Sequence, residues 1–146
     1  MYRIDELEDA LVNAITAAGY RAKPYTLEPG PNDLARETGE TPAALVSYHR
    51  CGAAKTATFQ LRRGLEFHFH LFVVARNLRS LSASAATRGD AAGAGLYAAL
   101  DGLRALLAGN RLGLAAQPLQ FIAETPVARS ANLSAYRQEW QWTVIE

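Results

Sequence analysis

Cysteine is almost absent from this chain: Cys51 is the only one, so an internal disulfide is excluded. No Cys/His spacing typical of a zinc site surrounds it. One interpretation of Cys51 is a reactive thiol. We favour the other, a small residue at the end of a strand, because no base is evident near it in the sequence.

Long apolar runs and a strong net charge are also missing. No stretch approaches the ~20 apolar residues of a membrane span, and the first six residues lack the basic region and apolar run of a signal peptide. The formal net charge is only +1, which excludes a global field typical of nucleic-acid or membrane binders. We therefore expect a protein kept, at least at first, in the cytoplasm, with no membrane partner and no specific nucleic-acid partner.

Signatures of catalysis are lacking as well. There is no Gly-x-Ser-x-Gly elbow, no His-Glu-x-x-His helix and no kinase signature. The segment from Gly89 to Gly95 superficially resembles a phosphate-binding loop, but it lacks the Lys-Ser/Thr ending of a P-loop and the spacing of a dinucleotide fingerprint. The sequence therefore predicts no enzyme, no catalytic residue, no cofactor and no cofactor-binding or metal-binding residue.

The composition is that of an ordinary globular protein. Of the 146 residues, 49% are hydrophobic and 20% are charged. A chain of this length has the usual size of one domain and buries most of its apolar surface. We expect a single domain over residues 1–146.

Two segments have the periodicity of amphipathic helices. Apolar residues at three- and four-residue steps predict a helix over residues 4–18, with Asp5 and Glu8 spaced as a capping box and Gly19 at its end. A second stripe predicts a helix that begins near Leu96 and ends before Gly109. Gly93 and Gly95 weaken its start and suggest a close approach to another backbone.

Alternating segments predict the strands. They cover residues 43–50, 56–62, 65–74, 119–125 (ending at Pro126) and 134–145, with a short extended piece over 112–117 and a turn over 128–132. In the strongest strand, one face is wholly apolar. The other face is polar for its first half and apolar for its second; it carries Glu66, His68, His70, Phe72 and Val74.

Two connections differ in charge. Residues 24–42 form a long loop rich in Pro and Gly that is acidic, and residues 62–88 are basic. The loop carries Glu28, Asp33, Glu37 and Glu40 against Arg36, and the basic stretch carries Arg62, Arg63, Arg76, Arg79 and Arg88 against Glu66. Either both are solvated surfaces, or the acidic loop of one subunit meets the basic stretch of its neighbour in a ring.

The order of elements predicts the fold class. One helix, two or three antiparallel strands, a second helix and two more strands give an α+β fold. We expect a mostly antiparallel sheet of about four to five strands with the two main helices packed on one face.

Two groups of side chains are candidates for a binding site. Alternation places His68 and His70 on one side of a strand with Glu66, where a metal would need a further ligand such as His49. A partly solvated strand face is the interpretation we favour.

Near the C-terminus, Tyr136, Trp140 and Trp142 suggest either a stacking platform for single-stranded nucleic acid or packing in the core or between subunits. We favour packing.

Several segments together resemble a known family. They are the strand 65–74, Arg88-Gly89-Asp90, Gly95-Leu96-Tyr97, residues 106–114, Pro118-Leu119 and the opening helix from Ile4 to Glu8. They cover nearly the whole chain and resemble the tail-terminator or tail-completion proteins of Mu-like, contractile-tailed bacteriophages.

The resemblance implies a structural protein of the virion. Such proteins assemble, often as hexameric rings, on the end of the tail tube, stop its polymerisation and join it to the head connector. The implied partners are further copies of the chain, the tail tube protein and the head–tail connector, first in the host bacterial cytoplasm and then in the virion tail. Alternatives are another minor tail or neck protein, or a metal-binding module using His68 and His70; a phage, prophage or bacteriocin origin stays open.

Overall fold

The computed structural model describes residues 3–25, 42–54, 64–76, 89–90, 93–114, 116–129 and 133–145. The helices are α1 (Ile4–Ala17) and α4 (Leu96–Leu107). The strands are β1 (Arg21–Pro24), β2 (Ala43–Ala53), β3 (Gly64–Arg76), β4 (Gly89–Asp90), β5 (Gly93–Ala94), β6 (Gln120–Arg129) and β7 (Leu133–Ile145).

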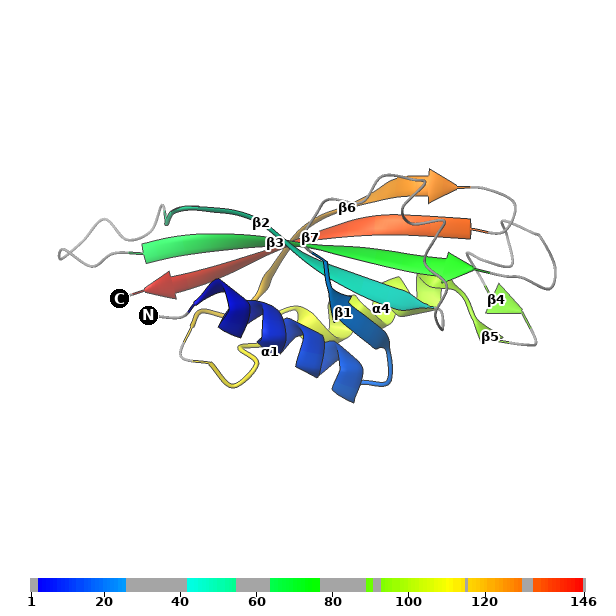
Figure 1. Ribbon diagram of the computed structural model, residues 1–146, viewed down its shortest axis with the longest axis horizontal. Coiled ribbons are helices and arrows are strands. Elements are labelled where there is room, and N and C mark those ends of the chain that lie inside the picture. The colour runs from blue at the N-terminus through cyan, green and yellow to red at the C-terminus, as the bar shows by residue number, and fades with distance from the viewer. Residues whose placement is uncertain are drawn as a thin grey trace.

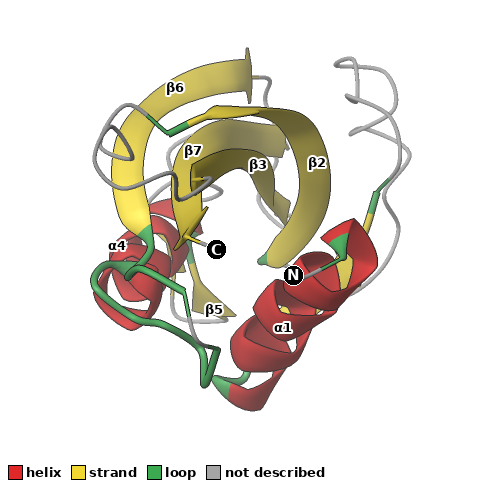
Figure 2. Ribbon diagram, turned by 90° about the vertical axis from the view of Figure 1, so that its left-hand side faces the viewer, coloured by secondary structure: helices red, strands yellow, loops and turns green. Residues whose placement is uncertain are grey.

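Five strands form one sheet in the order β1-β2-β3-β7-β6, in which only the pair β1–β2 is parallel. Both helices lie on the same side of this sheet (Figure 1). Figure 2 shows the sheet curving over them. The predicted α+β fold, with a mostly antiparallel sheet and two helices on one face, is confirmed.

The main core fills the space between the helices and the inner face of the sheet. Both helices contribute their predicted apolar stripes to it, and β3 and β7 contribute the residues that alternate inward. Its largest fully buried members are Trp140, Trp142, Phe69, Leu7, Leu11, Ile15, Leu71, Leu96 and Leu103.

A second apolar cluster lies on the outer face of the sheet. It consists of Leu45, Phe72, Val74 and Ala135, all buried, with Tyr25 and Val127 packed against them. Glu66 and His68, earlier on the same face of β3, are only partly buried. The prediction that this face is polar in its first half and apolar in its second is confirmed.

The first helix differs from its prediction at one end. Arg3 is the N-cap residue, and its backbone N–H donates to the Glu6 carboxylate at 3.0 Å, so the predicted pairing of Asp5 with Glu8 is wrong. The helix starts two residues earlier than that pairing requires, and Glu6 occupies the third helical position, where a side chain reaches back to the cap. Gly19 has φ +97°, which confirms the left-handed residue expected after the helix.

The second helix has the predicted bounds, with Gly95 as its N-cap and Gly109 at φ +74° beyond its end. Gly93 pairs with Asp90 in the short ribbon β4–β5, a backbone contact of the kind expected. Gly102 was not singled out in the sequence. The Tyr20 hydroxyl fills the space that a side chain at Gly102 would take, so this glycine lets the segment before β1 lie against α4.

Three further predictions need correction. Residues 112–117 are not extended, because Leu112 (φ 53°) and Gly113 (φ 76°) form a turn that the Asn110 side chain stabilises by accepting the Leu112 N–H. Pro126 does not end β6; it lies within this edge strand, where a missing N–H is tolerated. The strand continues to Arg129, so the first two residues of the predicted turn over 128–132 belong to it, and residues 130–132 lie outside the described part of the chain.

The short strand β1 was not predicted, since its four residues have no alternation and end in proline. The predicted strand over 56–62 lies outside the described residues. So do most of the acidic loop and most of the basic stretch.

Candidate functional site

The three histidines of the chain gather on the outer face of the sheet. The register pairs His70 with Glu139 and His68 with Arg50. A bulge in β2 falls between Tyr48 and Arg50, and the His49 ring stacks on His70 with centroids 4.1 Å apart and planes at 21°. A bulge re-aims a side chain in this way. The sequence indicated His49 only as a candidate for the further ligand that a metal would need, with no sign that it lies beside His70.

Charged groups surround the histidines. His68 Nε2 lies 3.8 Å from Glu66 Oε2, and His70 Nε2 lies 3.8 Å from Glu139 Oε1. Burial and the nearby Arg50 charge lower the pKa of His68, while Glu66 acts in the opposite direction. At neutral pH this imidazole is therefore held uncharged.

The described residues contain no group of three or more His, Cys, Asp or Glu side chains placed to hold a metal ion. Metal ligands direct their nitrogen lone pairs to one point. The face-to-face stacking of His49 on His70 does not do this. Glu66 and His68 are partly buried and paired with each other, as expected for a partly solvated strand face. That expectation is wrong for His70, which is buried with 5% of its surface exposed, because it lies between β2 and β7 and the His49 ring stacks on it.

Cys51 is exposed near the end of β2. Desolvation raises the pKa of its thiol. A raised pKa leaves less of the reactive thiolate at neutral pH, so the favoured interpretation as a small residue near a strand end agrees with this position.

The aromatic residues of β7 are mainly core residues. Trp140 and Trp142 are completely buried beneath the helices, so they are not available to stack on bases. Tyr136 is only partly buried, and its ring meets that of Tyr97 edge to face at 6.5 Å.

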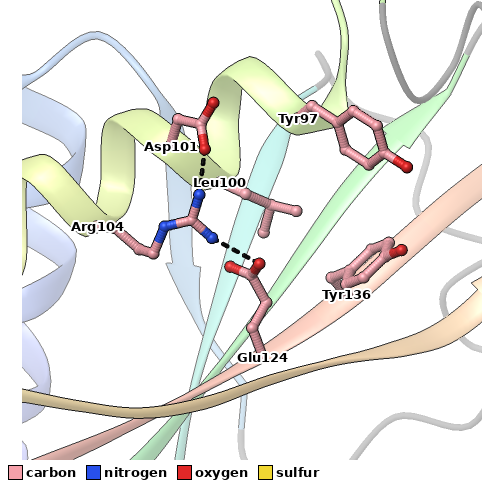
Figure 3. A pocket seen from close by; sticks show the side chains of 6 residues that line it. All are labelled: Tyr97, Leu100, Asp101, Arg104, Glu124 and Tyr136. Carbon is pink, nitrogen blue, oxygen red and sulfur yellow. Dashed lines mark hydrogen bonds and ion pairs between the residues drawn. The ribbon is translucent and has the colours of Figure 1, made fainter.

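A pocket of about 290 Å³ opens between α4 and the edge strand β6. Figure 3 shows Leu100 at its centre, an ion-paired group on one side and the two tyrosine rings on the other. Arg104 reaches from α4 to Glu124 on β6 with Nη1 and Oε2 2.6 Å apart, and also binds Asp101. The lining residues are Tyr97, Leu100, Asp101, Arg104, Glu124 and Tyr136.

A buried hydrogen-bond chain connects the pocket to the core. Gln138 Nε2 donates to Glu124 Oε1 at 2.9 Å and to the Leu100 carbonyl at 3.2 Å. Its Oε1 accepts the Trp140 indole N–H at 3.2 Å. Gln138 is fully buried, and this chain satisfies its amide and fixes Glu124 against α4.

The two edges of the sheet are unlike each other. On one side β6 is irregular, with register shifts after Phe121 and after Pro126, and both Phe121 and Ile122 are exposed. On the other side β1 pairs only with Ala43–Val46, so Ser47–Ala53 have no second strand beside them in the described part of the chain. Bulges and proline discourage plain strand addition at β6, which favours contacts through side chains there.

Comparisons with known proteins identify a family. The family model for "Bacteriophage Mu, Gp37" matches residues 3–145. The chain belongs to this family.

The resemblance to Mu-like phage proteins is thereby confirmed over nearly the whole chain. A comparison with curated protein sequences found no match. A solved structure similar to this chain is described as "Virion of native gene transfer agent (GTA) particle"; the identity is 19%, the TM-score 0.47, and the match covers 93% of this chain and 84% of that one. Within the described residues, no helix is both long enough and apolar enough to span a membrane.

Sequence reasoning missed the pocket. Its residues come from α4, β6 and β7, which alternation and helical periodicity treat separately. One signal was available: Gln138 is a polar residue between the aromatic residues Tyr136 and Trp140 on the inward face of its strand. A buried amide needs partners from neighbouring elements.

Proposed function

We propose that the protein is a structural component of a phage tail, a ring-forming tail terminator that caps the tail tube and joins it to the head connector. The observation that carries this proposal is the family match over residues 3–145. As one domain over residues 1–146, the chain works through its surfaces and without catalysis or a cofactor. It assembles in the host cytoplasm and then stays in the virion tail.

The geometry of the sheet supports assembly by side-chain contacts. One edge strand, β6, carries exposed Phe121 and Ile122 and also contributes Glu124 to the pocket, and at the other edge part of β2 has no second neighbour among the described strands. Two different surfaces at opposite edges suit a head-to-tail contact, and such contacts close into rings when the rotation between subunits permits. The partners are further copies of this chain, the tail tube protein and the head–tail connector.

Light scattering after size-exclusion chromatography tests the ring directly. We expect a discrete oligomer, such as a hexamer, either alone or on addition of tail tubes, with rings visible at tube ends by electron microscopy. A protein that stays monomeric in both conditions would overturn the terminator role. Rings that bind connectors but leave tube length unchanged would instead favour another neck or minor tail protein.

The histidines on the outer face of the sheet define a second candidate function, a metal-binding module, which can be tested directly. A metal-binding module centred on His68 and His70 requires bound metal in the purified protein. Stoichiometric zinc, manganese or iron that is lost in His68→Ala would replace the structural role with this one.

A further inference from the structure

The pocket between α4 and β6 contains groups that remain available for a partner. Tyr97 is 45% exposed, and its hydroxyl has no hydrogen bond to the described part of the chain. The Asp101 side chain is 72% exposed, and among the described residues it binds only Arg104, through Oδ1. Asp101 Oδ2 is therefore a free acceptor beside an accessible aromatic ring.

These two groups lie on one face of α4, because residues four apart in a helix are neighbours. An aromatic ring next to a carboxylate suits a guanidinium, which stacks on the ring and donates to the carboxylate. Leu100 at the centre of the pocket offers an apolar surface for the aliphatic part of such a side chain (Figure 3).

The pocket also has the right charge. Two carboxylates, Asp101 and Glu124, face one guanidinium, that of Arg104, which leaves one negative charge in excess. Glu124 has both oxygens occupied, by Arg104 and Gln138, so Asp101 is the carboxylate that accepts a new donor.

A matching cation lies at the opposite side of the sheet. Arg50 is exposed on the part of β2 that β1 does not cover, and it forms no ion pair with any residue the structure describes. The stretch Ser47–Ala53 contains no acidic residue. Its charge is thus complementary to that of the pocket.

We propose that the pocket binds the Arg50 side chain of a second copy of this chain. This inference rests on the self-assembly in the proposed function and names one contact of it. The pocket and Arg50 lie at opposite edges of the sheet. Each copy can therefore insert its Arg50 into the pocket of one neighbour and receive Arg50 from the other neighbour, as a closed ring requires.

Reversing the charges of Asp101 and Arg50, singly and together, tests the contact in the full chain. Sedimentation at low salt should show that Asp101→Arg and Arg50→Asp each weaken self-association about tenfold or more, and that the double variant restores it. Asp9→Arg, an exposed aspartate on α1, serves as the control. Single variants that associate like the control, or a double variant that associates no better than the singles, would overturn the proposal.

A small probe tests the pocket without any oligomer. Titration with N-acetyl-arginine amide, followed by NMR, should shift the Tyr97 and Leu100 resonances, and the neutral citrulline analogue should not. The response should disappear in Tyr97→Ala.

Together the two experiments distinguish a failure of the proposed ring from a failure of the proposed pocket contact. If the protein is oligomeric but does not bind the arginine probe, the proposed ring stands and the pocket is not its contact. A monomer that binds the probe overturns both the ring and Arg50 as the occupant.

Discussion

The two faces of the ladder between β3 and β7 are built from alternate residues of the same strands, yet only the outer face combines apolar residues with histidines and their acidic partners. The inner face carries Trp140 and Trp142, buried beneath the helices. The outer face carries Glu66 beside His68 and Glu139 beside His70, with 3.8 Å between the carboxylate oxygen and the imidazole nitrogen in each pair. We therefore expect substitutions on the inner face to lower stability strongly, and substitutions on the histidine-bearing part of the outer face to have small effects on stability.

Truncating the inner face should have the largest effect. Trp140→Ala removes a completely buried indole from the main core and should lower the free energy of unfolding by about 3–5 kcal/mol. Chemical denaturation measures this loss. Gln141→Ala, the neighbouring residue on the outer face, is the control and should change stability by less than about 0.5 kcal/mol. Equal losses would mean that the two faces are not energetically distinct.

Gln138→Leu should have the next largest effect, because it breaks the hydrogen-bond chain that connects Glu124, Gln138 and Trp140. The Trp140 indole N–H would lose its acceptor and Glu124 one donor, at a cost of about 1–3 kcal/mol. Denaturation of Gln138→Leu beside Gln141→Leu isolates the buried contribution. A neutral result for Gln138→Leu would show that the chain contributes nothing net to stability.

Sequence periodicity captured the inner face well. Apolar steps in α1 and α4 and alternation in β3 and β7 are local consequences of 3.6- and 2-residue repeats, so both helices and the long strands were predictable. The short β1 was not, because four residues held by parallel pairing to β2 leave no pattern. The prediction that Pro126 ends a strand was wrong for a related reason. Proline is tolerated in an edge strand, and the strand order that places β6 at an edge cannot be read from one sequence.

The candidate site depended on the same non-local information. Alternation placed His68 and His70 together, but only the bulge at β2 brings His49 onto His70. The pocket needs α4 to lie across β6, so neither Asp101 nor Glu124 had a local signal. The resemblance supplied a family, and the family offers no catalytic group that would point to these side chains.

Acidification should affect the outer face, with a smaller change than either substitution. The pKa of His68 is lower in the folded state than its ordinary value near ~6.5, so the unfolded chain takes up the proton first as pH falls. The contribution of this group to stability is present above that value and is lost as pH drops below it. Denaturation at pH 7.5, 6.5 and 5.5 should show a stability decrease that is reduced in His68→Gln. An identical pH dependence in this variant would assign the decrease to other groups.

The smallest expected effect concerns the charges around that imidazole. Burial lowers the pKa of His68 most, and Arg50 lowers it further while Glu66 raises it. Arg50→Ala should therefore raise the pKa of His68, and Glu66→Gln should lower it, in NMR titrations of the imidazole. Shifts of the same sign in both variants would mean that the substitutions act through burial and not through charge. Opposite shifts would show that nearby charges set the pKa of an outer-face imidazole, in contrast to the inner face, where packing and the Gln138 hydrogen bonds determine stability.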